Sequence, residues 1–178
     1  LGQAYTNDQA GVLAAVQQLL PKGRCLRPQE VGLLAASGCG RVHVHRRPVV
    51  GIISTGDEVV PMEAHPAPGQ IRDINTHTLA ALVQKAGARP KPYGIVGDHY
   101  DDLLKTCRTA LEECDMVLAS GGSSVGMRDL TLQALEALEQ SRILVHGISI
   151  RPGKPNILAQ CGSKAFWGLP GHVASAMV

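Results

Sequence analysis

Hydrophobic and polar residues follow one another in a repeating order from residue 49 to the end of the chain. Short β-branched and aliphatic runs, typical of strands buried on both faces, alternate with segments that carry apolar residues at helical spacing. The predicted strands are Val49–Ser54, Tyr93–Val96, Met116–Ala119 and Ile143–Ile150, and the predicted helices are 75–86, 100–114 and 129–138. A hairpin is expected where 156–160 and 164–167 flank Cys161-Gly162-Ser163.

Strands and helices that alternate at these lengths predict an α/β fold, a mostly parallel sheet with helices on both faces. The first 47 residues differ, with helical spacing over Asp8–Leu20 and Pro28–Ser37 and an alternating Val42–His45 that predicts a short strand. We therefore expect residues 1–47 to be a partial linker or part of a neighbouring domain. Residues 48–178 are expected to form the α/β domain, truncated at its C-terminus.

Composition narrows the class of protein. With 44% hydrophobic and 18% charged residues the chain is globular, and a net charge of +2 is too weak to argue for nucleic acid or an anionic membrane. No apolar run approaches the roughly 20 residues of a membrane span, and no signal peptide is visible. The 5 cysteines include no C-x-x-C pair, so we expect reduced core cysteines and a cytoplasmic location. The missing initial Met suggests a fragment.

Polar segments follow each predicted parallel strand. The carboxyl ends of such strands share one edge of the sheet, where ligands bind. Thr55-Gly56-Asp57-Glu58 follows the first strand, Asp98 the second, Ser120–Asp129 the third and Arg151–Lys154 the fourth. We expect these segments to converge at one rim.

The segment Ser120-Gly121-Gly122-Ser123-Ser124-Val125-Gly126 carries the strongest local signal. Its glycines allow positive φ and a close approach of the backbone, so several N–H groups can point at an anion beside a helix N-terminus. The alternative is a plain flexible turn. The segment fits neither G-x-G-x-x-G nor G-x-x-x-x-G-K-[ST], which argues against a Rossmann site and a P-loop.

Four acids, Asp57, Glu58, Asp98 and Asp129, are expected beside that segment. Clustered carboxylates repel one another unless a proton or a cation lies between them, and hard oxygen ligands suit Mg²⁺. A capping or solvated role is the alternative for each acid, and Asp129 in particular could cap the helix that it begins.

Cations and a second tight turn complete the candidate site. Arg151 and Lys154 flank Pro152-Gly153, which leaves the pair little freedom and suits the binding of phosphate or another oxyanion. The alternative is a charged surface turn. Gly168-Leu169-Pro170-Gly171, followed by His172 and Ser175, opens the last helix and is a weaker candidate anion site.

These motifs, in this order, resemble the molybdopterin molybdenumtransferase family, which includes MoeA and the E domain of gephyrin. The resemblance covers roughly residues 20–178. The matching segments are Ser54-Thr55-Gly56-Asp57-Glu58, Gly69-Gln70-Ile71-Arg72-Asp73-Ile74-Asn75, Gly94-Ile95-Val96-Gly97-Asp98, Ser120–Gly126, Pro152-Gly153-Lys154-Pro155, Gly168–Gly171 and the upstream 26–35.

The resemblance implies a three-layer α/β/α molybdopterin-binding domain that takes adenylylated molybdopterin and inserts molybdate with release of AMP, with a divalent cation such as Mg²⁺. Glu58, Asp98 and Asp129 would hold the metal or position water, and Lys154 and Arg151 would bind molybdate or phosphate oxygens. The substrate-binding residues would be Thr55, Gly56, Asp57, Ser120, Gly121, Gly122, Ser123, Ser124, Gly126, Pro152, Gly153, Gly168, Pro170, Gly171, His172 and Ser175.

The sequence departs from the family pattern at three places: Arg151 replaces Lys, His172-Val173 replaces Asn-Pro, and Ser123 replaces a hydrophobic residue. The choice of anion, molybdate or tungstate, therefore stays open. The resemblance implies a homodimer for the full-length protein, and the fragment alone could be inactive. Two alternatives stay open, a molybdopterin adenylyltransferase of the same fold and a non-catalytic binding or scaffold module.

Overall fold

The computed structural model describes residues 20–121 and 125–177, without the side chains of residues 125–129. Contacts divide the chain into two compact units with the boundary between Arg46 and Arg47. In the first unit, α2 spans Pro28–Ala36, close to the expected helix. The expected strand over Val42–His45 is wrong: all these residues are exposed and no strand pairs with them, so alternation alone did not suffice. The helix expected over Asp8–Leu20 lies outside the described residues, except at its end.

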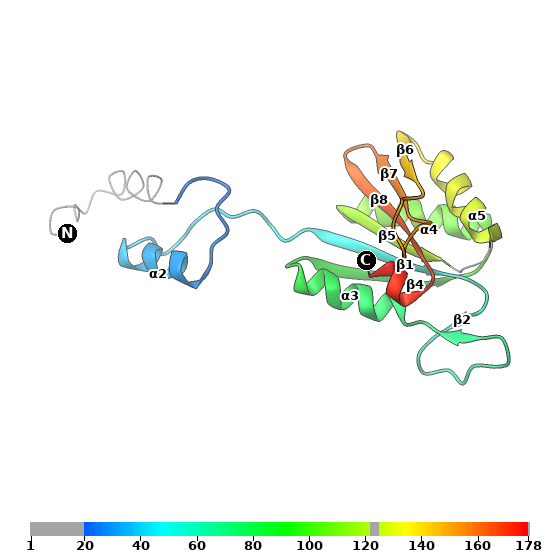
Figure 1. Ribbon diagram of the computed structural model, residues 1–178. Helices are drawn as coiled ribbons and strands as arrows, with labels where there is room; N and C mark the ends of the chain where they lie inside the picture. Colours follow the sequence, from blue (N-terminus) through cyan, green and yellow to red (C-terminus); the bar gives the residue numbers. More distant parts are fainter. Residues whose placement is uncertain (1–19, 122–124, 178) are drawn as a thin grey trace. The chain divides into compact units, whose positions relative to one another are not determined.

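A six-stranded sheet forms the centre of the second unit (Figure 1). Its order is β4-β1-β5-β8-β7-β6, and β4, β1, β5 and β8 are parallel, whereas β7 is antiparallel to both its neighbours. The mostly parallel sheet and the hairpin are thus confirmed. The strands are β1 Val49–Thr55, β4 Arg89–Val96, β5 Met116–Gly121, β6 Ser141–His146, β7 Ile157–Cys161 and β8 Lys164–Pro170.

Helices cover both faces of this sheet. Ile53 packs in one apolar cluster with Leu103 of α4 (Tyr100–Glu113) and Leu135 of α5 (Val125–Glu136). Its neighbour Ile52 points the other way and packs with Leu79 of α3 (Asn75–Lys85). Alternate side chains along β1 therefore pack into two hydrophobic cores, one on each face of the sheet. The sheet and the helices on its two faces form three layers. A short α6, Val173–Ala176, contacts β8 and α3.

Three boundaries differ from expectation for local reasons. β4 begins at Arg89 despite Pro90 and Pro92, because it is an edge strand and needs partners on one side only. β6 ends at His146, since Gly147 has a φ of 81°. α5 begins at Val125, so Asp129 lies within the helix and does not begin it.

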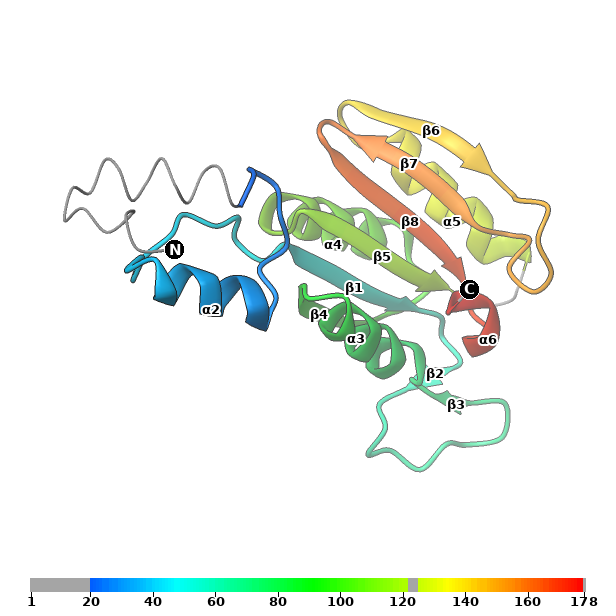
Figure 2. The same ribbon diagram turned by 60° about the vertical axis from the view of Figure 1, so that its left-hand side comes forward.

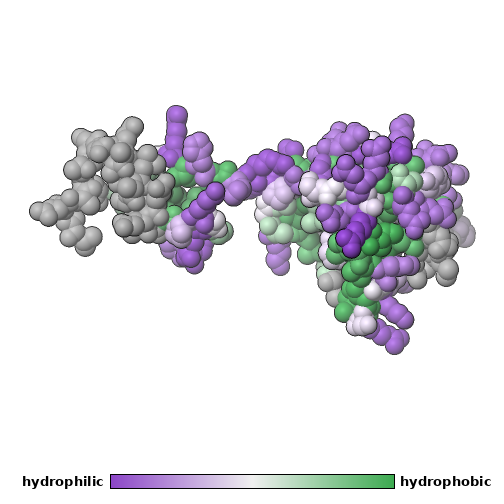
Figure 3. Space-filling model, turned by 90° about the horizontal axis from the view of Figure 1, so that it is seen from above, coloured by the Kyte–Doolittle hydropathy of each residue, from purple (hydrophilic) through white to green (hydrophobic). Residues whose placement is uncertain are grey.

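The surface is mostly polar, although some apolar residues reach it. Figure 3 shows hydrophobic residues exposed among hydrophilic ones. The exposed large apolar residues of the second unit include Ile71, Ile74 and Leu144. Among the described residues, no helix has the length and apolar character that a membrane crossing requires. Cys107, Cys114 and Cys161 are buried as expected, but Cys25 is exposed and Cys39 is only half-buried, so the prediction of core cysteines was wrong for these two.

Candidate functional site

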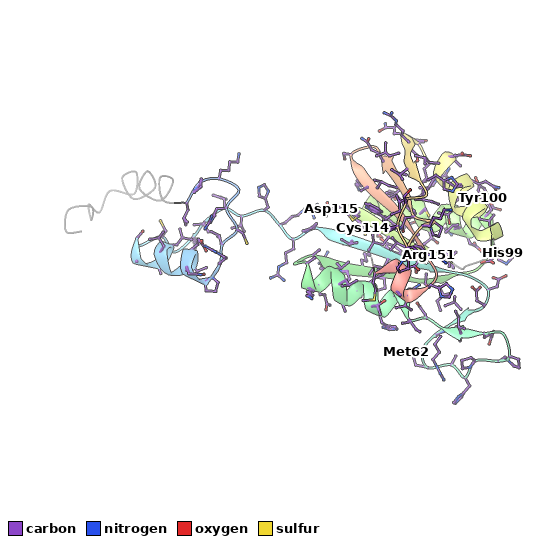
Figure 4. All side chains as sticks on the ribbon, viewed as in Figure 1. Met62, His99, Tyr100, Cys114, Asp115 and Arg151 are labelled. Atoms are coloured by element: carbon purple, nitrogen blue, oxygen red, sulfur yellow. The ribbon has the colours of Figure 1, made fainter. Side chains whose placement is uncertain are left out.

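The segments predicted to carry chemistry follow strands that run in one direction. β6 is antiparallel to β7, and β7 to β8, so β6 is parallel to β8, β5, β1 and β4. Their carboxyl ends therefore lie at one edge of the sheet. Figure 2 shows this edge beside α6 and the small parallel ribbon of β2 (Val59–Val60) and β3 (Ile71–Arg72). Figure 4 shows His99 at this edge and Asp115 at the opposite one.

A cavity of about 100 Å³ opens at this edge. It is bounded by the ends of β1 and β5, the β2–β3 ribbon, the start of α3 and the turn after β8. Its lining residues are Ser54, Thr55, Glu58, Val59, Ile71, Arg72, Asp73, Ile74, Asn75, Ser120, Gly121, Gly171, His172 and Val173. The structure thus brings together Thr55, Glu58, Ser120, Gly121, Gly171 and His172 of the predicted site.

The close approach of β1 and β5 shapes the floor of the cavity. Thr55 is 1% exposed, and its Oγ1 donates to the carbonyl of Ser120 at 3.3 Å. A Cβ built on Gly121 would lie 2.7 Å from that oxygen. A glycine is therefore required at position 121, where β5 ends and the glycine-rich segment continues.

Two polar residues of the cavity, Asp73 and Asn75, belong to a matching motif but were not predicted as site residues. Asp73 Oδ1 accepts hydrogen bonds from Ser54 Oγ at 3.2 Å and from the Thr76 backbone N–H at 3.0 Å. Asn75 Nδ2 donates to the carbonyl of Gly171 at 2.8 Å. These bonds tie the start of α3 to β1 and to the turn after β8. The sequence signal that could have identified them is this pair of polar residues at the start of a predicted helix, shortly after a Pro-rich loop.

The Pro-rich loop between β2 and β3 is closed by Arg72. Its Nε donates to the carbonyls of Met62 and Ala64, each at 3.1 Å. Figure 4 labels Met62 in this loop. Because Arg72 also lines the cavity, this loop is fixed beside the candidate site.

Three of the predicted acids lie close together. The Asp98 backbone N–H donates to Asp57 Oδ1 at 2.9 Å, and Glu58 folds against Gly56, whose φ is 134°. Burial raises the pKa of the Asp98 carboxyl, and the negative charges of Asp57 and Glu58 raise it further. Asp98 Oδ1 is buried and makes no hydrogen bond with any described residue. Unlike Glu58, Asp57 and Asp98 do not line the cavity.

This acidic cluster has the chemistry of a Mg²⁺ site, because carboxylate oxygens are the ligands that this ion prefers. A cation would also partner the buried Asp98 oxygen and relieve the repulsion. Among the side chains that the structure describes, no group of three His, Cys, Asp or Glu residues is arranged to hold a metal. The third predicted ligand, Asp129, is described only by its backbone in α5, so the three-residue metal site stays a prediction.

The predicted cations lie in the loop between β6 and β7. Arg151, labelled in Figure 4, and Lys154 are exposed and do not line the cavity. The loop between them is well held: the Ile148 N–H donates to the Lys154 carbonyl, and Asn156 Nδ2 donates to the Gly153 carbonyl, both at 2.8 Å. These cations thus follow β6 at the same edge, outside the cavity itself.

The remaining predicted residues have other surroundings. Gly168 is buried in β8, where a Cβ would lie 3.1 Å from Ile157 Cβ, so it serves the packing of the hairpin. Pro170 ends β8, and Ser175 in α6 is not part of the lining. Gly122, Ser123 and Ser124 lie outside the described residues, as does the side-chain environment at Gly126.

Comparison with known families matches this chain to one of them. Residues 51–178 match the model of the probable molybdopterin binding domain. The chain therefore belongs to the molybdopterin-binding domain family, and the resemblance seen in its motifs is confirmed.

Named relatives give a narrower similarity. The chain is 42% identical, over 98% of its length, to a molybdopterin molybdenumtransferase of Nostoc and spans 40% of that protein. It is 36% identical, over 90% of its length, to the molybdopterin molybdenumtransferase of Haemophilus influenzae and spans 39% of it. The chain thus spans about two fifths of the length of these relatives.

Solved structures agree with this assignment. The MoeA molybdopterin biosynthesis protein of Pyrococcus horikoshii superposes with a TM-score of 0.75 at 37% identity, covering 88% of this chain and 38% of that one. The MoaB protein of Thermus thermophilus, at 20% identity and a TM-score of 0.53 over 72% of this chain and 84% of that one, shows the shared fold alone.

Proposed function

We propose that the chain is the molybdopterin-binding part of a cytoplasmic molybdopterin molybdenumtransferase. It would bind adenylylated molybdopterin and take part in the insertion of molybdate with release of AMP, within a longer homodimeric protein. One observation carries the proposal: the ends of β1 and β5 and the turn after β8 enclose a single cavity beside the acids Asp57, Glu58 and Asp98. The names of the relatives support it.

The glycine-rich segment and its neighbours would bind the phosphate part of the substrate. Backbone N–H groups of residues 120–126 are suited to an anion, and the N-terminus of α5 adds a favourable dipole. Thr55 fixes the approach to this segment through its bond to the Ser120 carbonyl. The phosphate would thereby be held next to the acidic cluster.

Asp98, Glu58 and Asp129 would hold Mg²⁺ in the bound state. The ion would supply positive charge that offsets the phosphate oxygens. Asp98, whose Oδ1 has no hydrogen-bond partner among the described residues, would also position a water molecule for attack on the phosphate. Arg151 and Lys154, held by the rigid loop after β6, would bind the oxygens of molybdate and offset negative charge that develops in the transition state.

Release of AMP tests this proposal. The full-length protein, given adenylylated molybdopterin, Mg²⁺ and molybdate, is expected to release AMP in proportion to molybdate inserted. Asp129→Ala is expected to abolish this turnover while the protein remains folded, and Lys154→Ala to weaken the dependence on molybdate more than the binding of adenylate. Unchanged turnover would remove Asp129 from the mechanism.

The same assay separates the alternatives. Given ATP and molybdopterin, an adenylyltransferase would form the adenylylated pterin and release pyrophosphate. Formation of that product, without AMP release in the first assay, would overturn the proposal in favour of the adenylyltransferase. Absence of both products would favour a binding or scaffold module.

A further inference from the structure

Two buried polar atoms at the cavity have no hydrogen-bond partner among the described residues. They are Asn75 Oδ1 and Ser120 Oγ, and both residues line the cavity. Asn75 is 8% exposed and Ser120 is 1% exposed. Proteins seldom leave buried polar atoms without a partner, and such atoms at a cavity point to a bound ligand.

The Asn75 amide is held in one orientation. Its Nδ2 donates to the Gly171 carbonyl at 2.8 Å, and a carbonyl oxygen can only accept, so the nitrogen must face Gly171. Oδ1 is therefore fixed as an acceptor that lacks a donor. The Ser120 hydroxyl, at the end of β5, can donate or accept. A ligand with an N–H group fits this pair of atoms.

Part of the wall of the same cavity is apolar. Val59, Ile71, Ile74 and Val173 contribute to it. Ile71 is 56% exposed and Ile74 is 52% exposed, so both side chains are accessible to a ligand in the cavity. Aliphatic walls around a few fixed polar groups are typical of sites for flat organic ligands. Ile71 and Ile74 are thus placed to cover the face of a ring.

From these observations we infer that the cavity binds a planar nitrogen heterocycle of the substrate, whose exocyclic amine donates to Asn75 Oδ1. Asn75 is then a specificity-determining residue. This inference rests on the proposed function, under which the substrate carries two such rings, adenine and a pterin. Both present an exocyclic amine, so the recognition chemistry is shared. Of the charged residues named above, Glu58, Arg72 and Asp73 line this cavity, whereas Arg151 and Lys154 do not.

Ligand pairs that differ by one amine test the inference directly. The full chain is titrated calorimetrically with AMP and with purine riboside 5′-monophosphate, which lacks the amine. A second arm compares pterin with lumazine, in which a carbonyl replaces the amine. The amine-bearing ligand is expected to bind about tenfold tighter in one arm, the value for one hydrogen bond to a fixed partner, and that arm identifies the ring. Equal affinities in both arms would overturn the inference.

Variants then assign the discrimination to Asn75. Asn75→Leu is expected to bring the ratio of affinities to about one, because it removes the acceptor oxygen. A preference retained in Asn75→Leu would overturn the assignment. Gln84→Leu, an exposed site on α3 outside the cavity, is the matched control and should change nothing.

Two further measurements keep the test decisive. Ser120→Ala removes a hydroxyl with no partner among the described residues, so it should fold normally and weaken the binding of both members of the pair. If Asn75→Leu does not fold, Ser120→Ala and the wild-type comparison decide. Molybdate-dependent AMP release without amine discrimination overturns this inference alone. Discrimination without AMP release overturns the proposed function alone.

Discussion

Thr55 Oγ1 lies only 2.7 Å from the position that a Cβ on residue 121 would occupy, which is closer than a carbon and an oxygen can pack. The two residues end neighbouring parallel strands, and Thr55 is fixed by its bond to the Ser120 carbonyl. Gly121→Ala is therefore expected to lower the free energy of unfolding by about 1–3 kcal/mol through overpacking, and to reduce AMP release. Urea unfolding and the turnover assay measure both effects.

The double variant Thr55→Ala/Gly121→Ala tests the cause. Removing Oγ1 makes room for the new methyl group, so the double variant should be more stable than Gly121→Ala by itself. Thr55→Ala as a single change should cost about 1 kcal/mol for the lost hydrogen bond. If the double variant were no more stable than Gly121→Ala, the clash with Thr55 would not be the reason that glycine is needed.

Asp98→Asn is expected to stabilise the protein at neutral pH. The pKa of Asp98 is raised above its ordinary 3.8 by burial and by Asp57 and Glu58, so its ionised form is disfavoured in the folded state. The resulting penalty is absent below pH 3.8 and complete above the raised pKa. Asp98→Asn should therefore raise Tm by about 2 °C at pH 7 without divalent cations, and the gap should close as the pH falls.

A control with the same change in charge is Glu139→Gln, at an exposed position. It should leave Tm nearly unchanged. A lower Tm for Asp98→Asn at pH 7 would mean that Asp98 is stabilised by its surroundings and would argue against the repulsive acidic cluster.

Lys164 caps the carboxyl end of α4. Its Nζ donates to the carbonyls of Leu111 and Glu112, which have no partner within the helix. Lys164→Met keeps most of the side-chain volume but removes these bonds, so we expect a loss of about 1 kcal/mol in chemical unfolding. Lys105→Met, an exposed site on the same helix, should cost much less. Equal losses would show that the cap contributes nothing.

The stability of the first unit is expected to depend on pH through Glu30. Its carboxylate accepts from the Arg27 side chain and from Arg24, which lowers its pKa from 4.5 to about 2. A lowered acid pKa stabilises the fold above the unfolded value, and this contribution is lost as the pH falls from 4.5 towards 2. Amide exchange in α2 should accelerate over that window, and Glu30→Gln should remove the dependence. A carboxyl carbon signal of Glu30 that titrates near 4.5 would contradict this account.

Strands of the sheet could be predicted from the local sequence where both of their faces are buried. Val49–Thr55 is buried throughout, and its continuous apolar run predicted it well. The Val42–His45 alternation failed because a strand needs a neighbour, and the period of a short segment carries no information about one. The 8-residue length of β4 was missed because Pro90 and Pro92 speak against a strand until its edge position is known.

The sequence was sufficient to predict which edge of the sheet holds the candidate site. The direction of the parallel strands places Thr55, Glu58 and Ser120 together, and topology alone suggests this. Asp73 and Asn75 escaped because their importance depends on bonds to Ser54 and Gly171, which lie far away in the sequence. Sequence patterns report local periodicity, whereas a cavity is defined by side chains from several elements.

A crystal of the protein soaked with AMP, Mg²⁺ and molybdate would show where the substrate groups bind. The AMP phosphate is expected at residues 120–126, the metal ion beside Glu58 and Asp98, and molybdate within reach of Lys154. Ligands bound at the opposite edge of the sheet, near Asp115, or a phosphate remote from all of these residues would contradict the proposal.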